Sequence, residues 1–259
     1  MIGAIIGDIV GSDYEFNNTS DYDFPLFAEG SDFTDDTICT VAVADAILNK
    51  MDYQTAIRKW CRQYPHPKGE YGSYFFNWVM RPDPYPYNSF GNGSAMRVSP
   101  VAWLFDNEKD VRKQAEASAA ITHNHPEGIK GAEATAVAIF MARNGASKAD
   151  IKAYISDRFG YDLDRSVSEI RKSYGFDVSC QGSVPESIIC FLESTDYESA
   201  VRLAVSLGGD ADTQGAITGS IAAAYYKEIP DMIFNNAWSL LTTEIQNTVS
   251  SFGTYLLRT

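Results

Sequence analysis

Two short segments concentrate aspartate and threonine at places where a helix is expected to begin. The first reads FTDDT at residues 33–37 and precedes the run ICTVAVADAIL. The second reads LGGDADT at residues 207–213 and precedes QGAITGSIAAAYY. Carboxylate and hydroxyl oxygens are the ligands that hard cations such as Mg²⁺ and Mn²⁺ take in octahedral sites. Each segment is therefore a candidate source of metal ligands from the first turn of a helix.

Helix capping is the simpler interpretation of either segment alone. Thr and Asp cap helix N-termini, and acidic residues in the first turn complement the helix dipole. A cap needs only one side chain, however, and the two segments together hold four aspartates: Asp35, Asp36, Asp210 and Asp212. Four buried carboxylates would repel one another strongly without a cation. Two such helix starts brought together predict a pair of metal ions that share a bridging carboxylate.

Other metal chemistries lack the residues they need. The chain has three histidines, His66, His123 and His125, and none follows a glutamate by three residues, as a ferritin-like di-iron bundle requires. There is no HExxH motif, and the four cysteines form no CxxC pair that could hold zinc.

The elements that must position these residues are helices. Apolar residues recur at three- and four-residue spacings along most of the chain. Strand-like alternation is scarce, and its best candidate, at 22–27, is short. The spacing of Gly3, Gly7 and Gly11 indicates close helix packing, and Pro126, Pro185 and Pro230 are expected near helix starts. The predicted helices cover 36–49, 53–63, 99–105, 109–121, 127–144, 148–157, 186–193, 197–207, 213–226 and 231–249.

Two stretches, 12–33 and 64–95, are expected to be long irregular connections and therefore candidate binding loops. In the segment LGGDADT (207–213), Gly208-Gly209 is expected to let the chain turn tightly before the helix. We find no repeat and no flexible linker. The prediction is an all-α fold, a single compact multi-helix domain over residues 1–259.

The amino-acid composition excludes several classes of protein. Apolar residues make up 45% of the 259, enough for a sizeable core, which excludes a disordered chain. The net charge of -13 excludes a general nucleic-acid binder and argues against binding to anionic membranes. Residues 1–49 carry ten acids and no Lys or Arg, so they hold -10 of that charge and the remainder holds -3. Because these acids alternate with apolar residues, we expect some of them in the interior.

The cysteine pattern and the first twelve residues indicate the expected cellular compartment. Without a disulfide framework, a reducing, cytoplasmic compartment is expected. The segment MIGAIIGDIVGS lacks a basic start and is interrupted by Asp8, so it predicts neither a signal peptide nor a membrane span. We take a monomer as the default.

Five segments, in order along the chain, carry a resemblance to a known family: GDIVGSDYE (7–15), FTDDT (33–37), GNGSAMR (91–97), ITHNHPEGIKGAEATA (121–136) and LGGDADT (207–213). The chain resembles the ADP-ribosylglycohydrolases, which include the dinitrogenase reductase-activating glycohydrolase and the ADP-ribosylarginine and ADP-ribosylserine hydrolases. The combination of FTDDT, GNGSAMR and LGGDADT is highly specific.

The resemblance implies an all-α fold with a binuclear site for two divalent cations, Mg²⁺ or alternatively Mn²⁺. It assigns Asp212 as the best candidate to bridge both ions, and Asp8 to support the site rather than bind metal. By similarity, the metal ligands are Thr34, Asp35, Asp36, Asp210, Asp212 and Thr213.

The resemblance also assigns substrate-binding residues. By similarity, Phe90 stacks on adenine, Gly91, Asn92, Gly93 and Ser94 line the ligand, and His123 donates in its neutral form to ribose or phosphate. From the residues alone, the Gly91–Ser94 segment is equally well an Asn-Gly turn and a cap. His125 is interpreted as structural.

The implied activity is hydrolysis of the C1″ glycosidic bond between ADP-ribose and an acceptor side chain, arginine or serine. Glu15 corresponds to a glutamate on a mobile flap near the metals. Glu15, Asp35, Asp36 and Asp210 are candidate catalytic carboxylates, which could stabilise an oxocarbenium-like transition state or act as general base.

Several alternatives stay open at this stage. The substrate could be another ADP-ribose conjugate, such as O-acetyl-ADP-ribose or poly(ADP-ribose). The chain could instead be a non-catalytic ADP-ribose-binding or structural member of the family, or an acidic helical interaction domain whose Asp-Thr clusters are only caps. Arginine and serine linkages, and Mg²⁺ and Mn²⁺, are not distinguished by the sequence.

Overall fold

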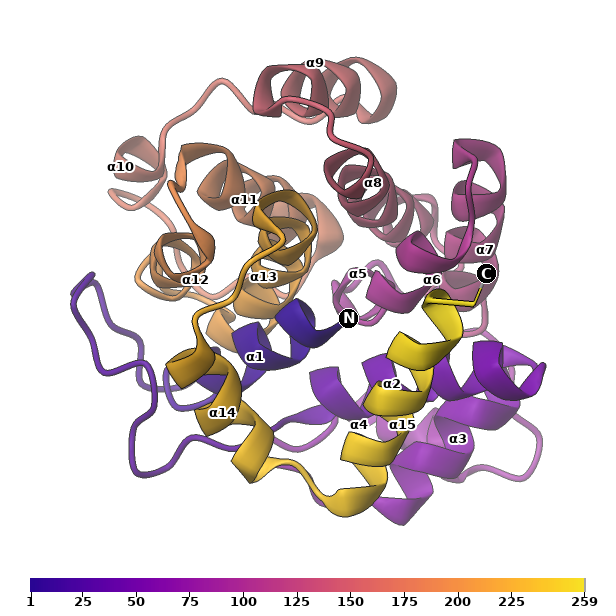
Figure 1. Ribbon diagram of the computed structural model, residues 1–259. Coiled ribbons are helices and arrows are strands. Elements are labelled where there is room, and N and C mark those ends of the chain that lie inside the picture. The colour runs from indigo at the N-terminus through magenta and orange to yellow at the C-terminus, as the bar shows by residue number, and fades with distance from the viewer. Residues whose placement is uncertain (259) are drawn as a thin grey trace.

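A computed structural model describes residues 1–258, and over that range the chain forms fifteen helices and no β-strand (Figure 1). The all-α prediction is confirmed. Two isolated bridges, Thr34 with Lys68 and Gly91 with Ser179, are the only strand-like pairings in this range. The helices are α1 (Ile2–Gly11), α2 (Asp35–Asn49), α3 (Tyr53–Gln63), α4 (Ser73–Met80), α5 (Gly93–Met96), α6 (Ser99–Leu104), α7 (Glu108–Ala120), α8 (Pro126–Arg143), α9 (Lys148–Phe159), α10 (Val167–Ile170), α11 (Cys180–Glu193), α12 (Tyr197–Val205), α13 (Ala211–Tyr226), α14 (Asp231–Leu240) and α15 (Thr243–Leu256).

The centre of the fold is the contact between α1 and α13, which run antiparallel. Gly3 faces Gly219, Gly7 faces Gly215, and Gly11 faces Ala211. A Cβ atom built on Gly7 would lie 2.0 Å from the carbonyl oxygen of Gly215, so only glycine allows the two backbones to approach this closely. The glycine spacing near the N-terminus therefore does mark close helix packing, as expected.

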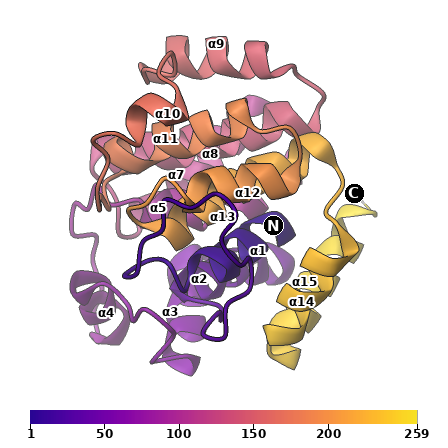
Figure 2. The ribbon, with the colours of Figure 1, turned by 90° about the vertical axis from the view of Figure 1, so that its left-hand side faces the viewer.

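The remaining helices enclose this pair. Helices α8, α11 and α12 pack on one side of α13, and α2 packs on α1 with α3 and α15 outside it. In Figures 1 and 2, α9 lies at one outer edge above α8, while α3 and α4 lie toward the opposite edge. The connection between α1 and α2 faces the viewer in Figure 2, beside α1 and α13. No described helix combines the length and the hydropathy that crossing a membrane requires.

Most predicted helices are present, and the differences have local causes. The segment 231–249 is two helices, because Leu241 is extended and Thr242 caps α15 by accepting from Ile245 N–H. Pro185 lies inside α11 rather than at its start, because Ser179 caps that helix six residues earlier. The expected loop 64–95 contains α4, whose aromatic run SYFFNWVM buries Phe75, Trp78 and Val79. No strand forms at 22–27.

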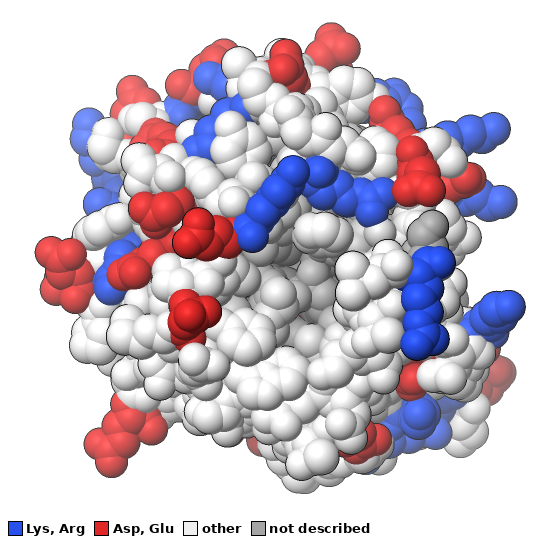
Figure 3. Space-filling model, in the orientation of Figure 1, with Lys and Arg blue, Asp and Glu red and all other residues white. Residues whose placement is uncertain are grey.

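Several acids of the N-terminal segment are in the interior, as the interleaved pattern predicted. Asp8, Asp36 and Asp45 are at most 6% exposed. Asp45 is neutralised locally, since its Oδ2 accepts from Lys59 Nζ at 3.1 Å and from Trp60 Nε1 at 2.8 Å. On the face shown in Figure 3 both signs occur, mostly over the upper half and along the edges, so the acidic excess does not form one continuous patch there.

The α1–α13 contact predicts a severe effect of a single added methyl group. Gly7→Ala places a Cβ against the Gly215 backbone, which cannot move aside as a side chain could, so we expect a loss of about 3 kcal/mol or more in the free energy of unfolding. Gly253→Ala, in α15, is the matched control because nothing lies within 4 Å of its added Cβ. That variant should be unchanged or more stable by up to ~1 kcal/mol. Urea denaturation compares the two, and equal stabilities would contradict the close approach.

Candidate active site

Asp8 organises the start of α2. Its carboxylate is fully buried and accepts from Thr34 at both the backbone N–H (3.1 Å) and the hydroxyl (2.7 Å). It also accepts from the backbone N–H (3.1 Å) and the hydroxyl of Thr37. Because α1 is fixed against α13, these four hydrogen bonds also fix where α2 begins.

The start of α13 is shaped by the two glycines before it. Gly208 and Gly209 have φ angles of +84° and +83°, a conformation that L side chains rarely adopt, so the predicted tight turn is confirmed. The turn places Asp210 immediately before the helix and Asp212 in its first turn, both at most 5% exposed. Asp210 accepts from Asn92 Nδ2 at 2.6 Å, and Asp212 accepts from Thr213 N–H at 2.9 Å.

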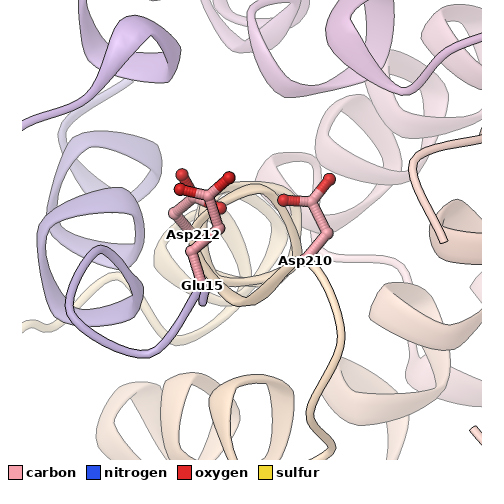
Figure 4. A group of neighbouring side chains, drawn as sticks. All are labelled: Glu15, Asp210 and Asp212. Carbon is pink, nitrogen blue, oxygen red and sulfur yellow. The ribbon is translucent and has the colours of Figure 1, made fainter. Parts of the chain in front are cut away.

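The carboxylates of Glu15, Asp210 and Asp212 converge. One oxygen from each lies within 4.8 Å of the other two, and Figure 4 shows the three carboxylates close together beside the start of α13. Asp35 and Asp36 lie at the start of α2 and line the same cavity. The structure therefore brings together both Asp-Thr segments and the glutamate from the loop after α1.

Proximity and burial raise the pKa of every carboxyl in this group. Burial raises the pKa of Asp8 and of Asp210 to about 6. Burial, together with the charges of Asp212 and Asp8, raises the pKa of Glu15 to about 8. Burial and the charge of Asp212 also place the pKa of Asp35 and of Asp36 well above its usual range. Without a cation, the cluster favours binding protons over releasing them.

The residues present fit a divalent cation site. Asp36 Oδ2 is buried and has no hydrogen-bond partner among the described residues, although a buried carboxylate oxygen normally has one. The converging carboxylates of Glu15, Asp210 and Asp212 likewise offer oxygen ligands. Hard cations such as Mg²⁺ and Mn²⁺ match this donor set.

The two threonines assigned by resemblance are placed differently. Thr213 lines the cavity, and its hydroxyl lies 3.9 Å from Met96 Sδ. Thr34 is fully buried, and its hydroxyl donates to Asp8 while accepting from Asp36 N–H at 3.1 Å. Thr34 therefore acts as the N-cap of α2 here, and its assignment as a metal ligand stays a prediction.

A cavity of about 690 Å³ opens above the acidic cluster. Phe90, Gly91, Asn92 and Gly93 line it, and the Phe90 ring is 49% exposed. Ser94 lies behind this wall, where it is fully buried and its hydroxyl donates to the Gly128 carbonyl at 2.7 Å. The loop therefore presents an aromatic face and two glycines to the cavity, and Ser94 fastens the loop to α8.

The two histidines of THNHP have separate places. His123 is 5% exposed and lines the cavity, and burial together with the nearby charge of Arg97 holds its pKa well below the usual range. His125 caps α8, since its Nδ1 accepts from Glu127 N–H at 3.1 Å. His125 also meets Phe90 edge to face, with ring centroids 5.4 Å apart.

The loop that carries Glu15 is fastened at two points. Asn18 exchanges a pair of 2.9 Å hydrogen bonds with the backbone of Gly209, next to Asp210. Phe16 stacks on Phe176 with centroids 6.1 Å apart, although both rings are largely exposed. The carboxylate of Glu15 lies against Gly69, where an added Cβ would be 2.7 Å from Oε2.

Sequence reasoning predicted Phe90 but missed most of the other side chains on the aromatic side of the cavity. Tyr71, Tyr74 and Phe75 lie at and before α4, and Phe176 and Val178 lie in the connection before α11. The available signal was the aromatic content of 64–95, which suggested a binding loop but not which rings face the ligand.

Comparisons with known proteins agree with this geometry. The family model described as ADP-ribosylglycohydrolase matches residues 1–249. The chain is 27% identical to ADP-ribosylhydrolase ARH3 of Danio rerio, covering 87% of this chain and 81% of that protein. It is 24% identical to ADP-ribosylarginine hydrolase Tri1 of Pseudomonas putida, covering 92% and 73% respectively.

A solved structure shares the fold. It is described as an ADP-ribosylglycohydrolase-related protein complex and aligns with a TM-score of 0.73 and 24% identity, covering 97% of this chain and 95% of that one. The family match over nearly the whole chain and the convergence of both Asp-Thr segments lead to one conclusion. The chain belongs to the ADP-ribosylglycohydrolase family.

Proposed function

We propose that the protein is a metal-dependent hydrolase that cleaves the C1″ glycosidic bond between ADP-ribose and an acceptor, an arginine or serine side chain. The observation that carries the proposal is the convergence of Glu15, Asp210 and Asp212 with Asp35 and Asp36 at the base of one cavity. Relatives named as hydrolases of ADP-ribosylated substrates support it. The proposed cofactors are two Mg²⁺ ions, with Mn²⁺ as the alternative.

The proposed ligands are Thr34, Asp35, Asp36, Asp210, Asp212 and Thr213. When bound, such cations would neutralise these carboxylates, hold the ribose hydroxyls and acidify a water molecule. Asp212 is close to acidic residues of both segments. Its charge raises the pKa of Asp35 and of Asp36 in the first segment, and its carboxylate lies beside that of Asp210 in the second. That position suits the bridging role.

The other side chains around the cavity are assigned roles in substrate binding, in positioning and in proton transfer. Phe90 offers a half-exposed face on which an adenine ring can stack, and His123 offers a neutral imidazole to an oxygen of ribose or phosphate. The Asn92 side-chain amide donates a hydrogen bond to Asp210, so it holds that carboxylate in place. Glu15 holds or accepts a proton beside the cluster, and the neighbouring aspartates favour a positively charged ribose C1″.

The substrate assay tests the proposal directly. The protein is incubated with ADP-ribosyl-arginine and ADP-ribosyl-serine peptides in Mg²⁺, Mn²⁺ or EDTA, and free ADP-ribose is quantified. Release that needs metal and occurs from one peptide would establish both the activity and the linkage. Absence of release from both peptides in either metal would contradict the proposal.

Asp212→Asn tests the metal assignment. For the wild type, Mg²⁺ at a hundredfold above Kd should add ~2.7 kcal/mol to the free energy of unfolding, roughly 5–10 °C in Tm. The variant should lose this gain and its activity, yet in EDTA it should be at least as stable as wild type, because a repelling charge is removed. Asp157→Asn, on the exposed face of α9, is the matched control and should keep both properties. A full Mg²⁺ gain in Asp212→Asn would overturn the ligand set.

Glu15→Gln separates proton transfer from metal binding. We expect kcat to fall by about a hundredfold or more, because a general acid or base is removed, while the Tm gain in Mg²⁺ persists. Glu29→Gln, an exposed residue of the same loop, should leave both unchanged. Loss of the Mg²⁺ gain in Glu15→Gln would show instead that Glu15 is a metal ligand.

The raised pKa values predict that the metal-free protein loses stability as the pH rises. Asp8 and Asp210 have a pKa of about 6 and Glu15 of about 8, so the folded chain keeps protons that the unfolded chain releases above about pH 4. The free energy of unfolding in EDTA should therefore fall from about pH 4 to pH 8. Urea denaturation at several pH values measures this, and Mg²⁺ should reduce the fall. Greater stability in EDTA at pH 8 than at pH 5 would contradict it.

A further inference from the structure

Arg97 is a fully buried cation in the wall of the cavity. Its guanidinium has no carboxylate within 4.0 Å among residues 1–258. Its Nη2 donates to the Ser118 carbonyl at 3.0 Å and to Thr122 Oγ1 at 2.8 Å. Retaining a buried charge without an ion pair is costly, and the proposed function does not account for it. The hydrogen bond to Thr122 suggests what the charge does.

Thr122 links Arg97 to His123. The Thr122 hydroxyl is fully buried and has two partners among the described residues, Arg97 Nη2 and His123 Nδ1, the latter at 2.7 Å. A guanidinium can only donate, so Thr122 Oγ1 accepts from Arg97. The hydroxyl hydrogen then needs an acceptor, and His123 Nδ1 is the only one of the two partners that can accept.

This arrangement determines the tautomer of His123. Since Nδ1 accepts from the hydroxyl, the single proton of the neutral imidazole is on Nε2. A cationic imidazole is disfavoured, because the ring is buried beside the charge of Arg97 and its other ring neighbour, Tyr87, is uncharged with a raised pKa.

The other ring nitrogen faces the cavity. Gly93 and Gly91, which line the cavity, lie beside this nitrogen: Cβ atoms built on them would be 3.1 and 3.5 Å from His123 Nε2, a tight contact at Gly93 and an ordinary one at Gly91. Within the described residues Nε2 has no protein hydrogen-bond partner, although the residue is 95% buried (5% exposed). The Nε2 hydrogen therefore points at the space left for a ligand.

We propose that Arg97 and Thr122 are positioning residues that hold His123 in the Nε2–H tautomer, so that His123 can only donate a hydrogen bond to a ligand oxygen. The ligand half of this proposal rests on the proposed function, in which that oxygen belongs to a phosphoryl group or a ribose hydroxyl. The tautomer itself does not depend on the substrate.

Nitrogen NMR tests the tautomer without any activity measurement. The chain has only three histidines, so long-range proton–nitrogen spectra of ¹⁵N-histidine-labelled protein resolve each imidazole. We expect His123 to show a protonated Nε2 and a hydrogen-bonded, unprotonated Nδ1 from about pH 5.5 to 8. A protonated Nδ1 or a cationic ring at His123 near pH 7 would overturn the proposal.

Two variants test the positioning residues separately. Thr122→Val removes the hydroxyl, so the Nδ1 resonance should move to that of a nitrogen without a hydrogen bond, whereas Thr122→Ser should keep the wild-type spectrum. Arg97→Met frees the Ser118 carbonyl to accept the Thr122 hydroxyl, so Nδ1–H should become populated. An unchanged Nδ1 signal in Thr122→Val would remove Thr122 from the proposal, and an unchanged tautomer in Arg97→Met would remove Arg97.

Ligand binding tests the consequence for function. In Thr122→Val we expect the Kd for ADP-ribose, measured by calorimetry, and the KM for a hydrolysed conjugate to rise by about tenfold. The value of kcat should stay within about twofold, and Thr122→Ser should restore both constants. An unchanged Kd would overturn the ligand half. If ADP-ribose binds but no conjugate is hydrolysed, the proposed hydrolysis is wrong. The tautomer of His123 and the Kd for ADP-ribose still test the roles of Arg97 and Thr122 in that case.

Discussion

The backbone contact between α1 and α13 is the constraint on which the site depends. Glycines at positions 3, 7, 215 and 219 bring two helices closer than any side chain would allow. At the far end of this contact Gly11 meets Ala211, so the last turn of α1 lies beside the first turn of α13. Asp8 then fixes α2 through Thr34 and Thr37. The contact between α1 and α13 thus determines the positions of the end of α1 and the starts of α13 and α2. The carboxylates at these helix ends are therefore held close together.

Fixed carboxylates create an electrostatic problem that the chain solves only in part. Asp8 accepts four hydrogen bonds and Asp210 accepts one from Asn92, but Asp36 keeps a buried oxygen that has no partner within residues 1–258. A fold that required only helix caps would have no reason to hold these groups together, since each adds repulsion to the native state. The unpaired oxygen and the raised pKa values are understandable if the folded state is completed by cations.

The sequence predicted those parts of the site whose residues are neighbours in the chain. The four aspartates could be found because each pair stands at one helix start, and the glycine spacing indicated the close packing. Contacts between distant residues gave no such signal: Asn92 reaches Asp210, 118 positions away, and Arg97 reaches Thr122, 25 positions away. Helix α4 was missed because its aromatic residues follow Pro and Gly, which are typical of loops. Glu15 stood out only through the family resemblance, because an acidic residue in an acidic loop is ordinarily solvated.

The ADP-ribose conjugate proposed as the substrate carries phosphates, whereas the chain has a net charge of -13. General attraction cannot bind such a substrate, and Arg97 is the only Lys or Arg among the described residues that line the cavity. Its side chain is fully buried, so it does not present its charge to a phosphate as a surface arginine would. Its charge acts instead through Thr122 on His123, which presents a neutral, directed donor. Such a donor discriminates by geometry rather than by charge, and it does not neutralise the carboxylates that the cations require.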